Sequence, residues 1–177
     1  MNGNLVTTSE RVFSELCARL GYQANKVPMN PPKKTPDFKV ASGENIIFAE
    51  VKQFDVNKIH KDIQSSLNNG GPHVDSLDFL HDGGLQRKAG QAAEQLKSKS
   101  REGYPTILVI YSERFLGPTD YQVNRALERG EVCMPPEISA IMVIKNEHIH
   151  PSNPSCRFFE NPDAAVKLPV GWFLESR

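Results

Sequence analysis

The sequence lacks the features of membrane proteins and of disulfide-rich secreted proteins. Its longest apolar runs, 46–49 and 106–111, are far shorter than the roughly 20 residues that a membrane-spanning helix needs. No basic, apolar, small-residue leader opens the chain. The 3 cysteines are odd in number and have no CxxC spacing, which fits reduced thiols better than a disulfide framework or a zinc ribbon. We therefore expect a soluble protein of the cytoplasm that does not bind membranes.

An excess of charge of either sign is also missing. The 21 Lys and Arg residues balance 21 Asp and Glu residues, whereas a dedicated nucleic-acid binder is often clearly basic. This balance argues against tight, sequence-blind binding. It does not exclude a nuclease, because bound cations offset acidic residues at a metal site and basic groups can gather on one face. Several lysines do fall in one short stretch: Lys26, Lys33, Lys34, Lys39 and Lys52.

Several well-known motifs are absent as well. The chain has no internal repeat, no Gly-rich phosphate loop after a strand, no GxSxG elbow and no heptad run. With 177 residues, of which 38% are hydrophobic, it is long enough for one core and short for two. We expect a single domain over residues 1–177, with its core at about 7–111 and a loop-rich insertion at 54–85.

An amphipathic helix is predicted from about Ser9 to Leu20. Apolar residues recur there at helical spacing, and Gly21 ends the pattern. Glu10 falls on the rim of the apolar face, so its carboxylate can reach inward. The helix pattern alone is equally compatible with an alternative. Thr7 and Glu10 would then form a capping box, in which the carboxylate of Glu10 only accepts a backbone N–H.

A hairpin is predicted directly after a basic, proline-rich loop. The loop, residues 28–36, contains four prolines and two lysines, which keep it out of regular structure. Residues 37–40 and 45–52 have the composition of strands, and 42–44 has that of a turn. These two strands should pair antiparallel.

The hairpin register predicts that two carboxylates meet. If the turn centres on 43–44, then Val40 faces Ile47 and Asp37 faces Glu50. Opposed Cβ atoms in such a pair lie about 4.5–5.5 Å apart. Two carboxylates at that distance repel each other unless a positive charge lies between them. The register therefore places a cation beside Asp37 and Glu50.

Glu50 and Lys52 lie two residues apart on one strand and so share a face. On a solvated sheet edge they would be only an exposed ion pair of little energetic value. The strand around Glu50 is dominated by apolar residues, however, and a carboxylate on a buried strand needs a partner or a function. Mg²⁺ prefers oxygen ligands, usually one or two carboxylates with water and substrate phosphate. The pattern favours a Mg²⁺ site, with Mn²⁺ as a substitute, beside a fixed positive charge.

The later elements predict a mixed α/β sheet. A helix followed by an apolar strand is a crossover connection. Gln86 and Lys88 occupy the flanks of the apolar stripe of that helix, so either can lean over the hairpin toward a substrate or lie on the surface as an ordinary polar residue. The predicted elements are a helix at about 85–99, a strand at 106–111, a helix at 121–129, a strand at 138–144 and a packing segment around 157–159.

These residues resemble a known superfamily. The set Glu10, Pro36-Asp37 and Glu50-Val51-Lys52, on helix, strand and strand, looks like that of the PD-(D/E)xK phosphodiesterases. The order helix, strand, strand, helix, strand is also that of the superfamily's common core. The resemblance covers about residues 7–111. Two matched segments of the first helix, Ser9-Glu10-Arg11 and Leu20-Gly21-Tyr22, are similar to the opening helix of archaeal Holliday-junction resolvases.

The resemblance implies a fold and an activity. The fold would be the restriction-endonuclease-like one, a three-layer α/β/α arrangement with a central mixed β-sheet. The activity would be metal-dependent hydrolysis of phosphodiester bonds in DNA, with an endonuclease favoured. Gln86 is only a loose match to the glutamine-tyrosine helix motif of helicase-linked nucleases, which leaves the subfamily open. It also stays open whether the substrate is DNA or RNA and whether two chains form a homodimer.

The same resemblance implies roles for individual residues. Asp37 and Glu50 would hold Mg²⁺, and the carbonyl of Val51 and the carboxylate of Glu10 would complete its shell directly or through water. Lys52 would orient the attacking water and stabilise the negative charge of the transition state. The side chains expected to bind substrate are Lys33, Lys34, Gln86 and Lys88.

Two other hypotheses remain at this point. A catalytically inactive module on the same fold would bind DNA or protein without turnover, and the neutral net charge agrees with it. Alternatively the match is accidental, and the domain acts through the 54–85 segment. In that case Asp37 and Glu50 would lie apart in space.

Overall fold

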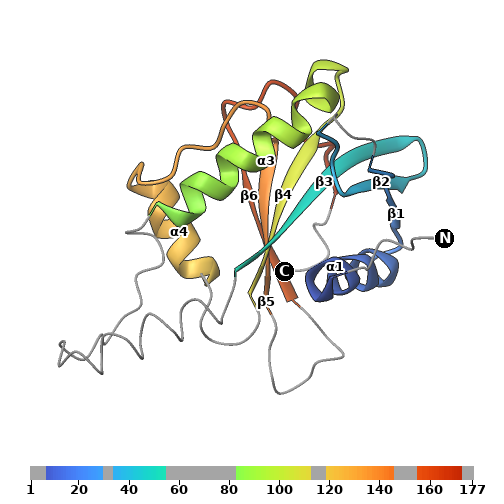
Figure 1. The fold of residues 1–177 in the computed structure, drawn as a ribbon, viewed down its shortest axis with the longest axis horizontal. Coiled ribbons are helices and arrows are strands. Elements are labelled where there is room, and N and C mark those ends of the chain that lie inside the picture. The colour runs from blue at the N-terminus through green and yellow to red at the C-terminus, as the bar shows by residue number, and fades with distance from the viewer. Residues whose placement is uncertain (1–6, 30–33, 55–82, 113–118, 146–154, 173–177) are drawn as a thin grey trace.

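The computed structural model describes residues 7–29, 34–54, 83–112, 119–145 and 155–172. Within these residues the chain forms an α/β fold of three helices and six strands (Figure 1). None of these helices is both long and apolar enough to cross a membrane. The elements are α1 (Thr8–Arg19), β1 (Gln23–Lys26), β2 (Phe38–Ser42), β3 (Asn45–Phe54), α3 (Gly84–Arg101), β4 (Thr106–Ser112), α4 (Asp120–Glu128), β5 (Ala140–Lys145) and β6 (Ser155–Glu160).

One mixed sheet forms the centre of the molecule. Its six strands lie side by side in chain order, from β1 to β6. β1, β2 and β3 pair antiparallel, β3, β4 and β5 pair parallel, and β6 is antiparallel to β5. Parallel neighbours need a crossover, and α3 and α4 lie in the two crossovers. The mixed sheet that the sequence predicts is confirmed.

The hairpin of β2 and β3 has the predicted register. Val40 pairs with Ile47, and Phe38 pairs with Ala49. Gly43 lies in the turn with φ +57°, in the left-handed region where a residue with a Cβ is strained. The turn and the register thus agree, and the next pair along the ladder would be Asp37 and Glu50.

Two of the strands were not predicted from the sequence. β1 has only four residues, which alternate between exposed and half-buried positions at one edge of the sheet. Such a short, polar edge strand carries almost no hydrophobic periodicity. β6 lies at the other edge, in the segment around 157–159 that we expected only to pack against the domain. Residues 55–82, most of the expected insertion, lie outside the described residues.

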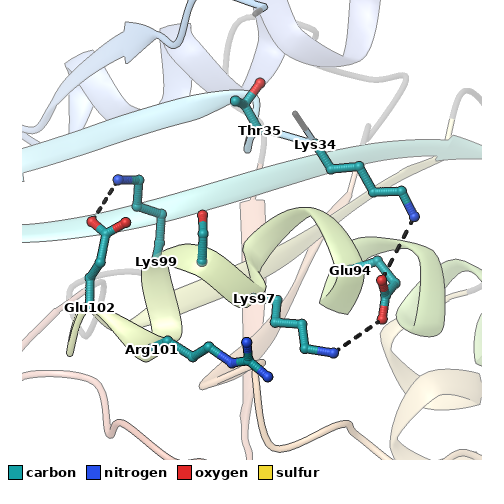
Figure 2. A pocket seen from close by; sticks show the side chains of 8 residues that line it. Lys34, Thr35, Glu94, Lys97, Lys99, Arg101 and Glu102 are labelled. Atoms are coloured by element: carbon teal, nitrogen blue, oxygen red, sulfur yellow. Dashed lines mark hydrogen bonds and ion pairs between the residues drawn. The ribbon is translucent and has the colours of Figure 1, made fainter. Parts of the chain in front are cut away.

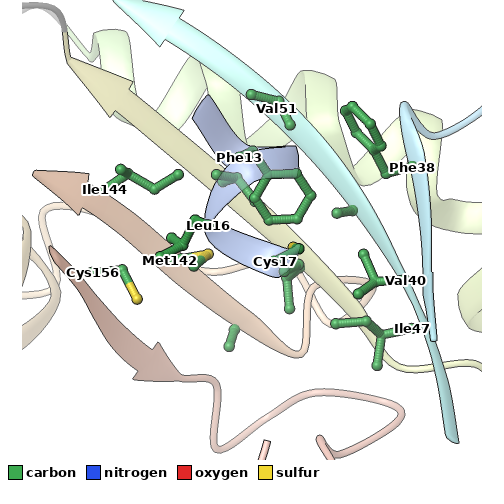
Figure 3. Close-up of a cluster of buried hydrophobic side chains, with 14 of the residues drawn as sticks. Phe13, Leu16, Cys17, Phe38, Val40, Ile47, Val51, Met142, Ile144 and Cys156 are labelled. Carbon is green, nitrogen blue, oxygen red and sulfur yellow. The ribbon is translucent and has the colours of Figure 1, made fainter. Parts of the chain in front are cut away.

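The helices cover both faces of the sheet, an arrangement compatible with a three-layer α/β/α fold. On one face α1 contributes Phe13, Leu16 and Cys17 to the core (Figure 3). Phe13 packs edge-on against Phe38 of β2, with ring centroids 5.3 Å apart. On the other face α3 and α4 bury a second apolar cluster against the even-numbered residues of β3, including Phe48. Cysteines 17, 133 and 156 form no disulfide among the described residues.

Candidate active site

The start of β2 and the middle of β3 bring Asp37 and Glu50 together. Oδ2 of Asp37 accepts a hydrogen bond from the backbone N–H of Val51 at 2.9 Å, so this carboxylate lies against β3. Glu50 is 1% exposed. Burial, together with the charge of Asp37, raises the pKa of Glu50 from 4.5 to about 7. The two carboxylates therefore interact, and they do not lie apart in space.

The two oxygens of Glu50 differ in their surroundings. Oε1 accepts a hydrogen bond from Nζ of Lys52 at 2.7 Å. Oε2 is buried and has no hydrogen-bond partner within the part of the chain that the structure describes. An unsatisfied buried acceptor costs about 1–3 kcal/mol, and more when it is charged. A divalent cation fits this oxygen, because carboxylates are the ligands that Mg²⁺ and Mn²⁺ prefer.

Lys52 is held by two partners. Its Nζ donates to Glu50 and also to Oε1 of Gln95 on α3, at 2.8 Å. Its side chain is 19% exposed, so the ammonium group lies at the border between core and solvent. Gln95 is not among the site residues predicted from the sequence. The signal was present, because Gln95 follows Lys88 by two helical turns on the same flank of α3.

Glu10 takes part in two interactions at once. Its Oε2 accepts the backbone N–H of Thr7 at 2.8 Å, so the expected capping box is present, although this is not the only interaction of Glu10. Its Oε1 accepts a hydrogen bond from Nζ of Lys26. Burial alone would raise the pKa of Glu10, but the hydrogen bonds from Lys26 and Thr7 lower it overall. The carboxylate reaches inward from α1, as the helical spacing predicted, and is 8% exposed.

Lys26 connects Glu10 with Asp37. Its Nζ lies 3.6 Å from Oδ1 of Asp37, and it also lies over the ring of Phe38, 5.1 Å from the centroid. Sequence analysis named Lys26 only as one of a group of lysines, because the strand that carries it was not predicted. In the structure this lysine places one positive charge beside both carboxylates.

The three carboxylates do not form a ready-made metal cage. Across the described ranges of the chain, no three His, Cys, Asp or Glu side chains are arranged to hold a metal ion. Asp37 and Glu50 interact with each other, whereas Glu10 is bonded to Lys26. Coordination by Glu10 and by the carbonyl of Val51 stays a prediction.

The expected substrate-binding residues have partners within the protein. The amide of Gln86 donates to the carbonyl of Cys133 at 3.3 Å and accepts its N–H at 2.8 Å. Nζ of Lys88 donates to the carbonyl of Gln53 at 2.8 Å. Both side chains therefore fix α3 against neighbouring segments, and contact with a substrate stays a prediction. Lys33 lies outside the described residues.

Lys34 borders a hollow between the segment before β2 and the second half of α3 (Figure 2). The hollow has a volume of about 450 Å³. Lys34 and Lys97 each lie 3.7 Å from a carboxylate oxygen of Glu94. We call this hollow the basic cleft, because four of its lining residues are basic and two are acidic: Lys34, Thr35, Glu94, Lys97, Ser98, Lys99, Arg101 and Glu102.

Comparison of the chain with models of protein families, with curated protein sequences and with solved structures finds no match in any of the three. The likeness to a nuclease superfamily therefore depends on the residues of this chain and on their arrangement.

Proposed function

We propose that this chain is a Mg²⁺-dependent nuclease with the restriction-endonuclease-like fold of the PD-(D/E)xK superfamily. The observation that supports this most is the buried oxygen Oε2 of Glu50, which has no partner among the described residues although Asp37 lies beside it. A cation bound by the buried Glu50 and the half-buried Asp37 would account for a carboxylate kept at this cost. The pair also lies beside a lysine, Lys52, at the positions that the superfamily's motif requires.

Each residue would have a defined role. Asp37 and Glu50 would hold Mg²⁺, with Mn²⁺ as a substitute, and the carbonyl of Val51 would add a neutral oxygen. When bound, the cation lowers the pKa of water and neutralises phosphoryl oxygens. Glu10 would orient water near the scissile phosphate, and Lys52 would stabilise the negative charge that develops in the transition state. Because Lys52 lies beside a carboxylate, it serves better as a fixed charge than as a base.

We propose DNA as the substrate and an endonuclease as the type of enzyme. The basic cleft supports a polyanionic substrate, because its net charge is positive although the whole chain is neutral. The cleft adjoins the site through two elements. Lys34 precedes Asp37 by three residues, and Lys99 follows Gln95 by one helical turn. A phosphate backbone that lies along α3 would thereby reach Lys52.

A panel of labelled DNA forms tests this function. Linear duplex, single strand and branched junction should each be incubated with Mg²⁺ and with excess chelator, together with labelled RNA. Cutting of at least one DNA form is expected with Mg²⁺ alone. The variants Asp37→Ala, Glu50→Ala and Lys52→Ala should each lose at least about 10²-fold in rate while keeping the wild-type circular dichroism spectrum. The matched control is Lys39→Ala, on the exposed side of β2. Full activity in chelator would refute the proposal.

An inactive binding module on the same fold is the second candidate. It is favoured by the bond between Glu10 and Lys26, which leaves no three carboxylates in position to hold a metal within the described segments. Such a module would bind DNA or protein and would show no divalent cation at Asp37 and Glu50. Crystals soaked in Mn²⁺ separate the two candidates, because anomalous scattering locates the ion directly.

A further inference from the structure

We propose that Lys26 is a built-in counter-ion that holds Glu10 away from the metal, so that each chain binds one divalent cation and not two. This inference depends on the proposed function, because it assumes a metal at Asp37 and Glu50. It adds a role for a residue outside the matched motif. Lys26 would be a positioning residue that sets the number of metal ions.

The carboxylate oxygens of the site have different partners. Oε1 of Glu10 is bonded to Lys26, and Oδ1 of Asp37 lies 3.6 Å from the same Nζ. Oδ2 of Asp37 accepts the N–H of Val51. The remaining buried oxygen without a partner in the described chain is Oε2 of Glu50. One oxygen of Glu10 and one oxygen of Asp37 thus lie beside the charge of Lys26, whereas Oε2 of Glu50 has no such partner among the described residues.

Several contacts hold Lys26 in place. It lies in β1, and the next residue, Val27, donates its N–H to the carbonyl of Asp37 at 2.8 Å. The ammonium group also lies over the ring of Phe38, a contact worth about 0.5–1 kcal/mol at an exposed position and more when desolvated. Glu10 in turn is fixed by the capping box of α1. An incoming cation would have to break several contacts to displace this lysine.

The net charge of the site favours one divalent cation. With every group ionised, three carboxylates (Glu10, Asp37 and Glu50) share the site with two ammonium groups (Lys26 and Lys52), which leaves one net negative charge. One divalent cation reverses this charge, and a second would add two positive charges to a positive site. Like charges in a partly buried site repel strongly because the effective dielectric constant is low. A second cation becomes favourable only when Lys26 is removed.

Counting bound Mn²⁺ by titration calorimetry and by electron paramagnetic resonance tests this inference without measuring activity. The wild-type chain should bind one Mn²⁺, and Lys26→Met, which keeps the length of the side chain, should bind two. Lys26→Arg keeps the charge and should bind one. Adding Glu10→Gln to Lys26→Met should restore one, because the second ion needs Glu10. Lys39→Met is the matched control and should bind one.

The possible results separate the inference from the proposed function. Two ions in the wild type, or one ion in a folded Lys26→Met chain, would overturn the role of Lys26 while the metal site stands. An absence of Mn²⁺ binding, or binding that survives Glu50→Gln, would overturn the metal site and the inference with it. If Lys26→Met does not fold, the single variant Glu10→Gln provides the test of the inference. It should still bind one ion with an affinity within about threefold of the wild type, because Glu10 is not a direct ligand, and a larger loss overturns the inference.

Discussion

Nζ of Lys52 lies 2.8 Å from Oε1 of Gln95, a residue that comes 43 positions later in the chain. This hydrogen bond joins β3 to α3 and fixes the direction of the ammonium group. We predict that Gln95→Ala lowers kcat about 10- to 100-fold with little change in KM, because a hydrogen bond to a charged group contributes about 1.5–3 kcal/mol. Steady-state kinetics on the DNA form that is cut provide the measurement. Gln91→Ala, on the exposed side of the same helix, is the control, and an equal loss in both variants would contradict the assignment.

Stability should fall with rising pH because of Glu50. The pKa of this carboxyl is raised from 4.5 to about 7, so the folded state keeps a proton that the unfolded state releases. The resulting contribution to the free energy of unfolding is fully present below pH 4.5. It decreases by about 3 kcal/mol between pH 4.5 and 7, and it stays constant above that range.

Urea unfolding in chelator, compared between the wild type and Glu50→Gln, measures this effect. The difference between the two curves should vary across pH 4.5–7, because only the wild type titrates at this position. Saturating Mg²⁺ at pH 8 should stabilise the wild type and leave Glu50→Gln unchanged. Parallel pH curves for the two proteins would argue against the raised pKa.

The capping boxes of α1 and α4 offer a matched pair of mutations. Thr7 caps α1 with Glu10 as its partner, and Thr119 caps α4 with Gln122 as its partner. Thr7→Ala and Thr119→Ala should each lower the free energy of unfolding by about 1 kcal/mol. Only Thr7→Ala should also reduce the cutting rate, because only α1 carries a carboxylate of the site. Equal cutting rates in the two variants would mean that Glu10 takes no part in the cutting reaction.

Binding of DNA should depend on salt through the basic cleft. Lys34 is 64% exposed there, and its ion pair to Glu94 is long, at 3.7 Å. We predict that Lys34→Ala weakens binding of all DNA sequences alike and reduces the slope of log K against log salt by about 1, as expected for the loss of one phosphate contact. Fluorescence anisotropy with Ca²⁺ in place of Mg²⁺ is a suitable assay. Arg157→Ala, on the opposite edge of the sheet, should leave the slope unchanged.

Much of the fold could be predicted because its elements have strong local patterns. The start and end of α1 follow from the cap at Thr7 and the stop at Gly21, which has φ +79°. The register of β2 and β3 follows from the turn at Gly43. β1 could not be predicted, because the pairing with β2, a tertiary interaction, determines it, and its own four residues alternate too weakly.

The candidate site, like the fold, has features that could be predicted from the sequence and features that could not. The proximity of Asp37 to Glu50 follows from the hairpin register, which local sequence determines. Helical spacing places Gln95 on the flank of α3 that carries Lys88, but it does not show that this flank contacts Lys52, which lies 43 residues earlier in the chain. Lys26, the partner of Glu10, lies on a strand that was not predicted. The lack of a hydrogen-bond partner for Oε2 of Glu50 among the described residues depends on how the surrounding segments pack together, which local sequence does not show.

Because the strands follow one another across the sheet, the contacts of β1, β2 and β3 close short loops, which are the first to form in a folding chain. We therefore expect the repulsion between Asp37 and Glu50 to arise early in folding. A proton on Glu50 or a captured divalent ion would relieve it at that stage. If the proposed divalent cation binds at this stage, it would also accelerate formation of the sheet.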